Sequence, residues 1–188
     1  MKFRLSITLT DEDYFEFNKF YALESHYGVN KPSKLRWFAT AILGLVILAA
    51  CFIGGFDLYF FIFSVSIFVL SVCYNLFWRQ LMSWSIKSNI KHLKKKGKLA
   101  YSPFSTLEFD EDLIVETTDD LRAEQKYSAI ERVSVVEGRY IYIHNSNLGA
   151  YIIPMSAFSD QSEYESFLDF LATLNIKTDI YKGNKHSK

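Results

Sequence analysis

The dominant feature of the hydrophobic pattern is an apolar block from Trp37 to Trp78, which contains Asp57 and no Lys, Arg, His, Glu or Pro. A helix needs about 20 apolar residues to cross a bilayer core, so the block is long enough for two spans. Gly54-Gly55-Phe56-Asp57 divides it. We therefore predict a transmembrane helical hairpin at 37–78, with helices at about 37–54 and 58–77. A buried hairpin in a soluble protein is the alternative, but 188 residues leave little chain to cover it.

Residues 1–36 are expected to form a strand followed by an amphipathic helix. Polar and apolar residues alternate from Phe3 to Leu9, which is typical of a half-buried strand. Thr10 or Asp11 then caps a helix that runs to about Ser25. Its aromatic face fits two roles, packing against a cytoplasmic domain or lying among lipid headgroups.

Basic residues flank the apolar block on both sides. Residues 79–98 carry seven basic and no acidic residues and are expected to form a juxtamembrane stem helix that ends at Gly97. The positive-inside rule then places both termini in the cytoplasm, and Trp37 and Trp78 are expected to anchor at one membrane interface. Candidate contacts to anionic lipid are the stem lysines Lys87, Lys91, Lys94, Lys95, Lys96 and Lys98.

After residue 98 the pattern changes to short strands, so the fold class is α+β. Six strands are predicted at 104–109, 112–118, 121–127, 131–136, 139–144 and 148–153, separated by acidic, Gly and Asn turns. Such spacing predicts an antiparallel meander. Ser159 or Asp160 caps a C-terminal helix, with Glu163 in the capping-box position. This domain is expected at 99–180, followed by a polar tail at 181–188.

Six strands closed by one helix, with the N-terminal strand available as a seventh, resemble a pleckstrin-homology-like (PH-like) domain. The order of parts resembles the bacterial YcxB-like family. The resemblance rests on residues 9–14 (Leu-Thr-Asp-Glu-Asp-Tyr), on Tyr127 to Val133 (Tyr-x-x-Ile-x-x-Val) and on Ile153-Pro154. It implies a bacterial membrane protein without an assigned activity, and it transfers no catalytic residues. Whether the N-terminal strand joins the later sheet stays open; if it does, the hairpin is an insertion into one folded domain.

Charge and composition favour binding over catalysis. Residues 99–188 carry 8 basic and 15 acidic residues, a net charge of −7, which is the reverse of a nucleic-acid-binding domain. His26, His92, His144 and His186 lie in separate segments, and Cys51 and Cys73 fall within the predicted spans. Acidic turns at 110–112 and 119–120 resemble calcium ligands without the spacing of an EF-hand. No catalytic residue, cofactor site, metal site or small-molecule substrate is predicted.

We therefore expect a non-enzymatic, multi-pass protein of the bacterial inner membrane, whose cytoplasmic PH-like domain binds a protein or peptide. Small residues four apart in the spans also allow a homodimer. The alternative is a module that senses lipid headgroups through the stem lysines. A third hypothesis, a hydrolase, requires several histidines and carboxylates to meet in one pocket.

Overall fold

The computed structural model describes residues 2–25, 33–53, 58–99, 101–145 and 149–182. The chain forms two compact units. The first, called here the globular unit, combines residues 1–17 with residues 97–188, and the second, the helical unit, consists of residues 18–96. The expected turn at 54–57, His26 and His186 lie outside the described residues.

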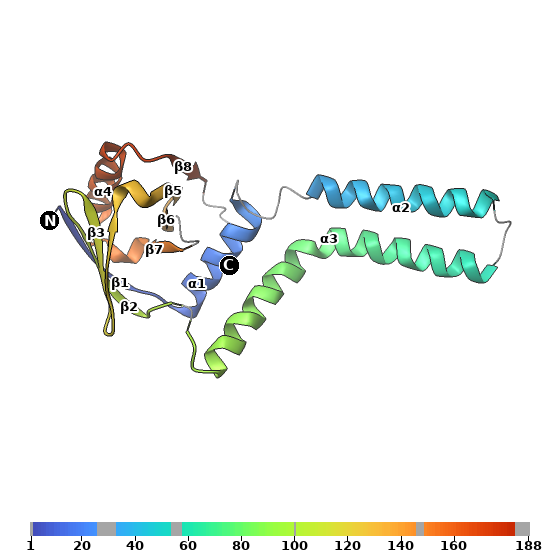
Figure 1. The fold of residues 1–188 in the computed structure, drawn as a ribbon, viewed down its shortest axis with the longest axis horizontal. Coiled ribbons are helices and arrows are strands. Elements are labelled where there is room, and N and C mark those ends of the chain that lie inside the picture. Colours follow the sequence, from blue (N-terminus) through green and yellow to red (C-terminus); the bar gives the residue numbers. More distant parts are fainter. Residues whose placement is uncertain (1, 26–32, 54–57, 100, 146–148, 183–188) are drawn as a thin grey trace. The chain divides into compact units, whose positions relative to one another are not determined.

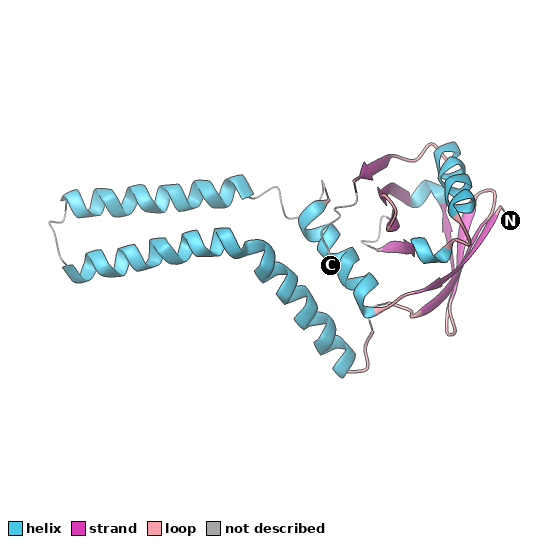
Figure 2. Ribbon diagram, turned by 180° about the vertical axis from the view of Figure 1, so that it is seen from behind, coloured by secondary structure: helices cyan, strands magenta, loops and turns pink. Residues whose placement is uncertain are grey.

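The globular unit contains two four-stranded sheets (Figures 1 and 2). The first sheet has the order β1-β2-β3-β4, with β1 at Phe3–Thr8, β2 at Phe104–Phe109, β3 at Leu113–Thr117 and β4 at Arg122–Lys126, all antiparallel. The second has the order β7-β6-β5-β8, with β5 at Ile130–Val136, β6 at Tyr140–Asn145, β7 at Ala150–Pro154 and β8 at Thr178–Tyr181. The short helix η2 at Tyr127–Ala129 connects β4 to β5. All six strands predicted after residue 98 are present.

The N-terminal strand belongs to the first sheet. Leu5 lies opposite Leu107 and Ile7 opposite Ser105 in the β1–β2 ladder. Leu5 is fully buried and Ile7 is nearly so. Strands that precede and follow the helical unit in the sequence therefore pair in one sheet. The sequence alone left this pairing open.

Strand β8 was not predicted. It pairs with β5 in parallel, with Ser134 opposite Asp179, so the second sheet is not a pure antiparallel meander. Tyr181 is the last residue of β8, which corrects the expected start of the polar tail at 181. Residues 183–188 of that tail lie outside the described residues.

Helix α4, at Gln161–Thr173, closes one end of the space between the two sheets. Asp160 caps it by accepting a hydrogen bond from the Glu163 amide at 2.8 Å, as the sequence predicts. Its Phe167 ring lies edge-on to Phe109, with the centroids 4.9 Å apart, and to Phe3 at 5.3 Å. Phe3 begins β1 and Phe109 ends β2, so α4 covers this end of the first sheet and leaves the opposite end to other elements.

Helix α1, at Asp11–Lys19, continues as a π-helical segment, η1, at Phe20–Glu24. Thr10 and Asp13 cap it reciprocally: the Asp13 carboxylate accepts from the Thr10 amide at 2.8 Å, and the Thr10 hydroxyl accepts from the Asp13 amide at 3.3 Å. Within the globular unit, Phe17 packs against Tyr142 of β6 at 5.2 Å between centroids, and Tyr140 donates to Asp13 at 2.8 Å. This part of the aromatic helix thus packs on the sheet.

The helical unit contains α2 at Ser33–Ile53 and α3 at Leu58–Lys95. Helix α2 begins before the apolar block, and α3 continues without a break through the predicted stem. Thr40 and Ser71 hydroxyls lie 2.9 Å apart, and a Cβ on Gly44 would lie 3.0 Å from the Phe68 ring. Small residues at Thr40 and Gly44 therefore let the two helices approach closely. Helix α3 is long and apolar enough to cross a membrane.

Candidate functional site

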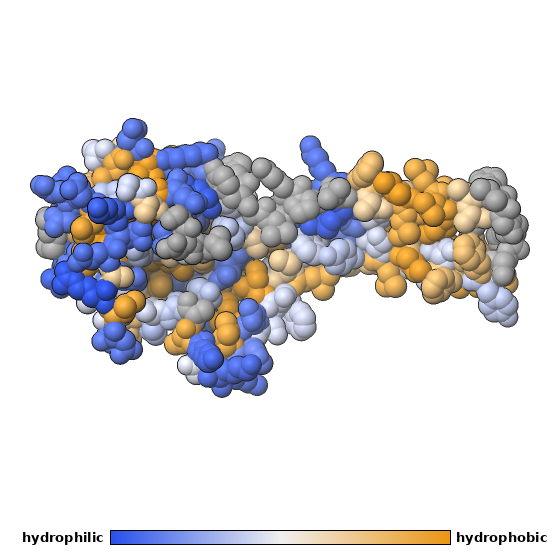
Figure 3. Space-filling view, viewed as in Figure 1, coloured by the Kyte–Doolittle hydropathy of each residue, from blue (hydrophilic) through white to orange (hydrophobic). Residues whose placement is uncertain are grey.

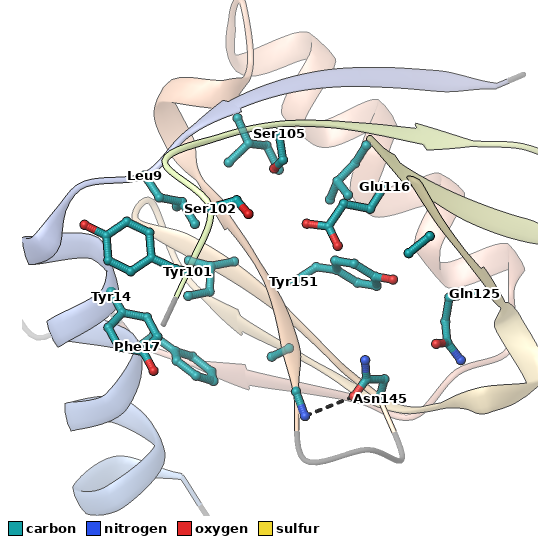
Figure 4. Close-up of a pocket in the computed structure, with 16 residues that line it drawn as sticks. Leu9, Tyr14, Phe17, Tyr101, Ser102, Ser105, Glu116, Gln125, Asn145 and Tyr151 are labelled. Carbon is teal, nitrogen blue, oxygen red and sulfur yellow. Dashed lines mark hydrogen bonds between the residues drawn. The ribbon is translucent and has the colours of Figure 1, made fainter. Parts of the chain in front are cut away.

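A cavity of about 450 Å³ lies between the two sheets of the globular unit (Figure 4). Ile7, near the end of β1, and Leu9, just after it, line the cavity, which therefore lies at the end of β1 away from α4. Its volume falls in the range of ligand pockets, about 300–1,000 Å³. The lining side chains that carry polar groups are Tyr14, Tyr101, Ser102, Ser105, Glu116, Gln125, Asn145 and Tyr151.

Glu116 occupies a core-facing position of β3. Side chains two residues apart on a strand share a face, and Ile114, two residues earlier, is fully buried in the core. In the sheet, Glu116 lies between Leu107 of β2 and Ala123 of β4. Desolvation by burial raises the pKa of its carboxyl group. A carboxylate on the apolar face of a sheet costs stability and is a common sign of a functional position.

Tyr151 of β7 faces Glu116 across the cavity, as Figure 4 shows. Burial raises the pKa of the Tyr151 hydroxyl, and the charge of Glu116 raises it further. The phenol therefore remains protonated at neutral pH and can donate a hydrogen bond. The pair provides one negative charge beside a neutral phenol.

Two amide side chains, Gln125 and Asn145, add further polar groups to the lining. The Asn145 Oδ1 accepts a hydrogen bond from the Gly149 amide at 3.0 Å. A Cβ at Gly149 would lie 3.1 Å from the same oxygen, so a glycine allows this close approach. Asn145 is thereby held in place at the end of β6.

One wall of the cavity comes from α1 and the segment before β2. The rings of Tyr14 and Tyr101 are stacked, with centroids 5.1 Å apart. The Tyr101 hydroxyl donates to Asp11 at 2.6 Å. Burial, followed by this hydrogen bond, raises the pKa of Tyr101 to about 12. Because its hydroxyl is engaged by Asp11, Tyr101 contributes an aromatic surface more than a free polar group.

The sixteen lining residues include no Lys, Arg, His or Cys. Within the part of the chain that the structure describes, Glu116 forms no ion pair and no hydrogen bond. The described lining residues therefore offer hydroxyls, amides, aromatic rings and one carboxylate that has no ion-pair partner among the described residues. Such a site suits a cationic or hydrogen-bond-donating ligand better than an anion.

A second polar cluster lies on the outer face of the second sheet. Ser134 and His144 are both buried, and the serine Oγ lies 3.1 Å from His144 Nε2. Desolvation, and then the charge of Arg132, lower the pKa of His144 to about 4, while Asp179 opposes the shift. The imidazole is therefore neutral at pH 7. Ser134 is fully buried and is not among the residues that line the cavity.

The six stem lysines proposed as lipid contacts are exposed. Trp37 is also exposed, while the half-buried Trp78 ring lies 4.2 Å from the Arg36 guanidinium. Residues 36 and 78 are therefore at the same level of α2 and α3. Among the described residues, no three His, Cys, Asp or Glu side chains cluster as metal ligands. None of these positions belongs to the cavity.

Glu116, Tyr151 and Gln125 were not predicted from the sequence as site residues. The sequence did contain a signal for Glu116. This residue lies two residues after Ile114 in a predicted strand, so both side chains are on the same face of the sheet. Tyr151 and Gln125 gave no comparable signal, since both are ordinary residues for a strand. Their convergence depends on how the two sheets face each other.

Comparison with known proteins gives one family. Residues 109–171, which run from the end of β2 into α4, match the model of the YcxB-like protein family. No curated protein and no solved structure matches the chain. The resemblance to the YcxB-like family that the sequence suggested is therefore confirmed by a match of the family model over residues 109–171.

Proposed function

We propose that the chain is an integral membrane protein anchored by α2 and α3. Helix α3 has 38 residues, about 57 Å at 1.5 Å per residue, against about 30 Å for a bilayer core. Large apolar side chains on both helices are exposed, including Leu45 at 66%, Phe63 at 65% and Leu70 at 68%. Figure 3 shows apolar residues gathered over α2 and the first half of α3. Lipid is the solvent that suits such a surface.

The proposed arrangement is a transmembrane hairpin with spans at about 37–54 and 58–77. The contacts Thr40–Ser71, Gly44–Phe68 and Arg36–Trp78 support antiparallel helices. Basic flanks on both sides of the apolar block favour a cytoplasmic location for both termini. In a bacterium, the globular unit would then lie on the cytoplasmic side of the inner membrane.

We further propose that the globular unit, a PH-like domain, is a non-enzymatic module that binds a protein or peptide partner. The carrying observation is the cavity of about 450 Å³ floored by Glu116 and Tyr151. Polar side chains on core-facing positions lower the stability of a small sheet and are explained by a ligand that contacts them. The helical unit would tether this site to the membrane.

Two experiments test this function. Full-length protein should stay in membranes after alkaline carbonate extraction, whereas a chain lacking residues 33–95 should be released. A photo-crosslinking amino acid at Tyr151, inside the cavity, should capture a discrete partner in cells. The same group at the exposed Leu121 serves as control. Release of the full-length chain would contradict the anchor, and equal crosslinking from both positions would contradict the site.

A second candidate function is lipid-headgroup sensing, favoured by the exposure of the six stem lysines. Each basic residue near an anionic surface contributes about 1 kcal/mol. A synthetic peptide of residues 79–98 should then bind vesicles containing phosphatidylglycerol and release from them at high salt. Equal binding to neutral vesicles would remove this candidate. The described residues that line the cavity include no cation that could bind a phosphate.

A further inference from the structure

The rim of the cavity includes an edge strand of the second sheet. Strand β7 forms one edge of the second sheet, and among the described strands it pairs with β6 alone. Ala150 and Ile152 of this strand both line the cavity. The cavity and the edge are therefore parts of one surface.

The hydrogen-bond pattern of β6 and β7 shows which backbone groups face outward. The Asn145 amide donates to the Gly149 carbonyl at 3.1 Å, and the Met155 amide donates to the Arg139 carbonyl at 2.9 Å. In an antiparallel ladder, hydrogen-bonded pairs alternate with pairs that are not bonded to each other. Counting from the bonded pairs Asn145–Gly149 and Arg139–Met155, the pairs that Ala150 and Ile152 form with β6 are not hydrogen-bonded. The N–H and C=O groups of Ala150 and Ile152 therefore point away from β6.

An extended polypeptide is the ligand that matches such an edge. It can add to the sheet through main-chain hydrogen bonds, while alternate side chains enter neighbouring pockets. A segment aligned on Ala150 and Ile152 would direct every second side chain toward the cavity. The side chain that enters would meet Glu116 and Tyr151.

The charge of the site selects the chemistry of that side chain. Glu116 lacks an ionic partner among the described residues, and the lining residues contain no cation. Residues 99–188 carry a net charge of −7, which favours the approach of a basic segment. Phenol, amide and hydroxyl oxygens around Glu116 can accept the remaining hydrogen bonds of an ammonium or guanidinium group.

We propose that the cleft binds an extended polypeptide segment added to the β7 edge, with a lysine or arginine side chain reaching Glu116. This inference rests on the proposed partner-binding function and specifies the partner's chemistry. The expected pair is a charge-assisted hydrogen bond in a partly desolvated site.

The test uses full-length protein in lipid nanodiscs and a display library of random eight-residue peptides. Selected peptides should share a Lys or Arg at one fixed position. Replacing that residue by uncharged norleucine or citrulline should weaken binding about 10- to 100-fold, the size expected for a charge-assisted hydrogen bond of roughly 1.5–3 kcal/mol. The protein variant Glu116→Gln should remove this difference, since the two changes act on one contact.

Glu124→Gln is the matched control. Glu124 is on the neighbouring strand β4 and loses the same charge, but it is exposed and lies 3.7 Å from Arg122. It should leave the affinity for the selected peptide within about twofold of the wild type, because exposed charges contribute little. Near-ultraviolet circular dichroism of the tyrosines checks that both variants are folded.

Two measurements on the peptide side need no protein variant. Shortening lysine to ornithine and then to diaminobutyrate should weaken binding stepwise as the cation withdraws from Glu116. Methylating backbone amides one at a time should block binding only at alternate positions, because an added strand bonds through alternate amides. Tolerance of methylation at every position would overturn the edge arrangement.

Other outcomes separate the inference from the function beneath it. If selected peptides lack a shared basic residue, or bind Glu116→Gln as tightly as wild type, the cation-binding inference is wrong while partner binding stands. If the wild-type protein selects no peptide above the empty nanodisc, both are contradicted.

Discussion

Buried His144 makes the stability of the globular unit depend on pH in a direction that can be worked out. Its pKa falls from 6.5 to about 4 on folding, chiefly through desolvation and then through Arg132. Between these two values the unfolded chain binds a proton that the folded chain excludes. Stability therefore decreases as pH falls from 6.5 to 4, and the pKa difference corresponds to about 3 kcal/mol.

The variant His144→Gln tests this reasoning. Glutamine keeps a group that can hydrogen-bond Ser134, which lies 3.1 Å from Nε2, but it does not titrate. Urea unfolding of the full chain in micelles, followed by tyrosine circular dichroism between pH 4 and 7.5, measures both proteins. Protonating carboxylates destabilises both alike, so the wild type should lose about 3 kcal/mol more than the variant. Parallel curves would show that His144 does not exclude its proton and would refute the reasoning.

Three further outcomes are expected. Leu5→Ala should cost about 2–5 kcal/mol in urea unfolding because Leu5 is fully buried, whereas the exposed Ser6→Ala should change stability by less than about 0.5 kcal/mol. Gly44→Leu should lower the thermal midpoint of helical circular dichroism in micelles, because even a Cβ would lie 3.0 Å from Phe68. Burial raises the pKa of Glu116 in the folded state, so the wild type should lose stability as the pH rises above the usual carboxyl pKa. Glu116→Gln should abolish this loss.

Local patterns predicted most of the elements because each depends on residues close in sequence. Alternation from Phe3 to Leu9 defined β1, and the Asp160–Glu163 pair defined the start of α4. The basic run after Trp78 correctly indicated that α3 continues beyond the apolar block. These signals are periodicity and capping, and the tertiary structure does not override them here.

Pairings between distant segments were harder to predict. Strand β8 is only four residues long, and its parallel pairing with β5 depends on the path of α4. The cavity likewise depends on two sheets that face each other, so Tyr151 and Gln125 give no local signal. Glu116 was detectable in principle, because a carboxylate two residues from the buried Ile114 breaks the strand's apolar face.

The central claim is that residues 1–17 and 97–188 fold as one unit, with the helical unit inserted between them in the sequence. Amide hydrogen exchange of the full chain in nanodiscs tests it most directly. Leu5 and Ile7 face β2 in the ladder, so their amides should exchange with the same opening free energy as those of β2. The amides of α2 and α3 should be protected with an opening free energy of their own. Exchange of Leu5 and Ile7 within seconds, while β2 stays protected, would contradict the claim.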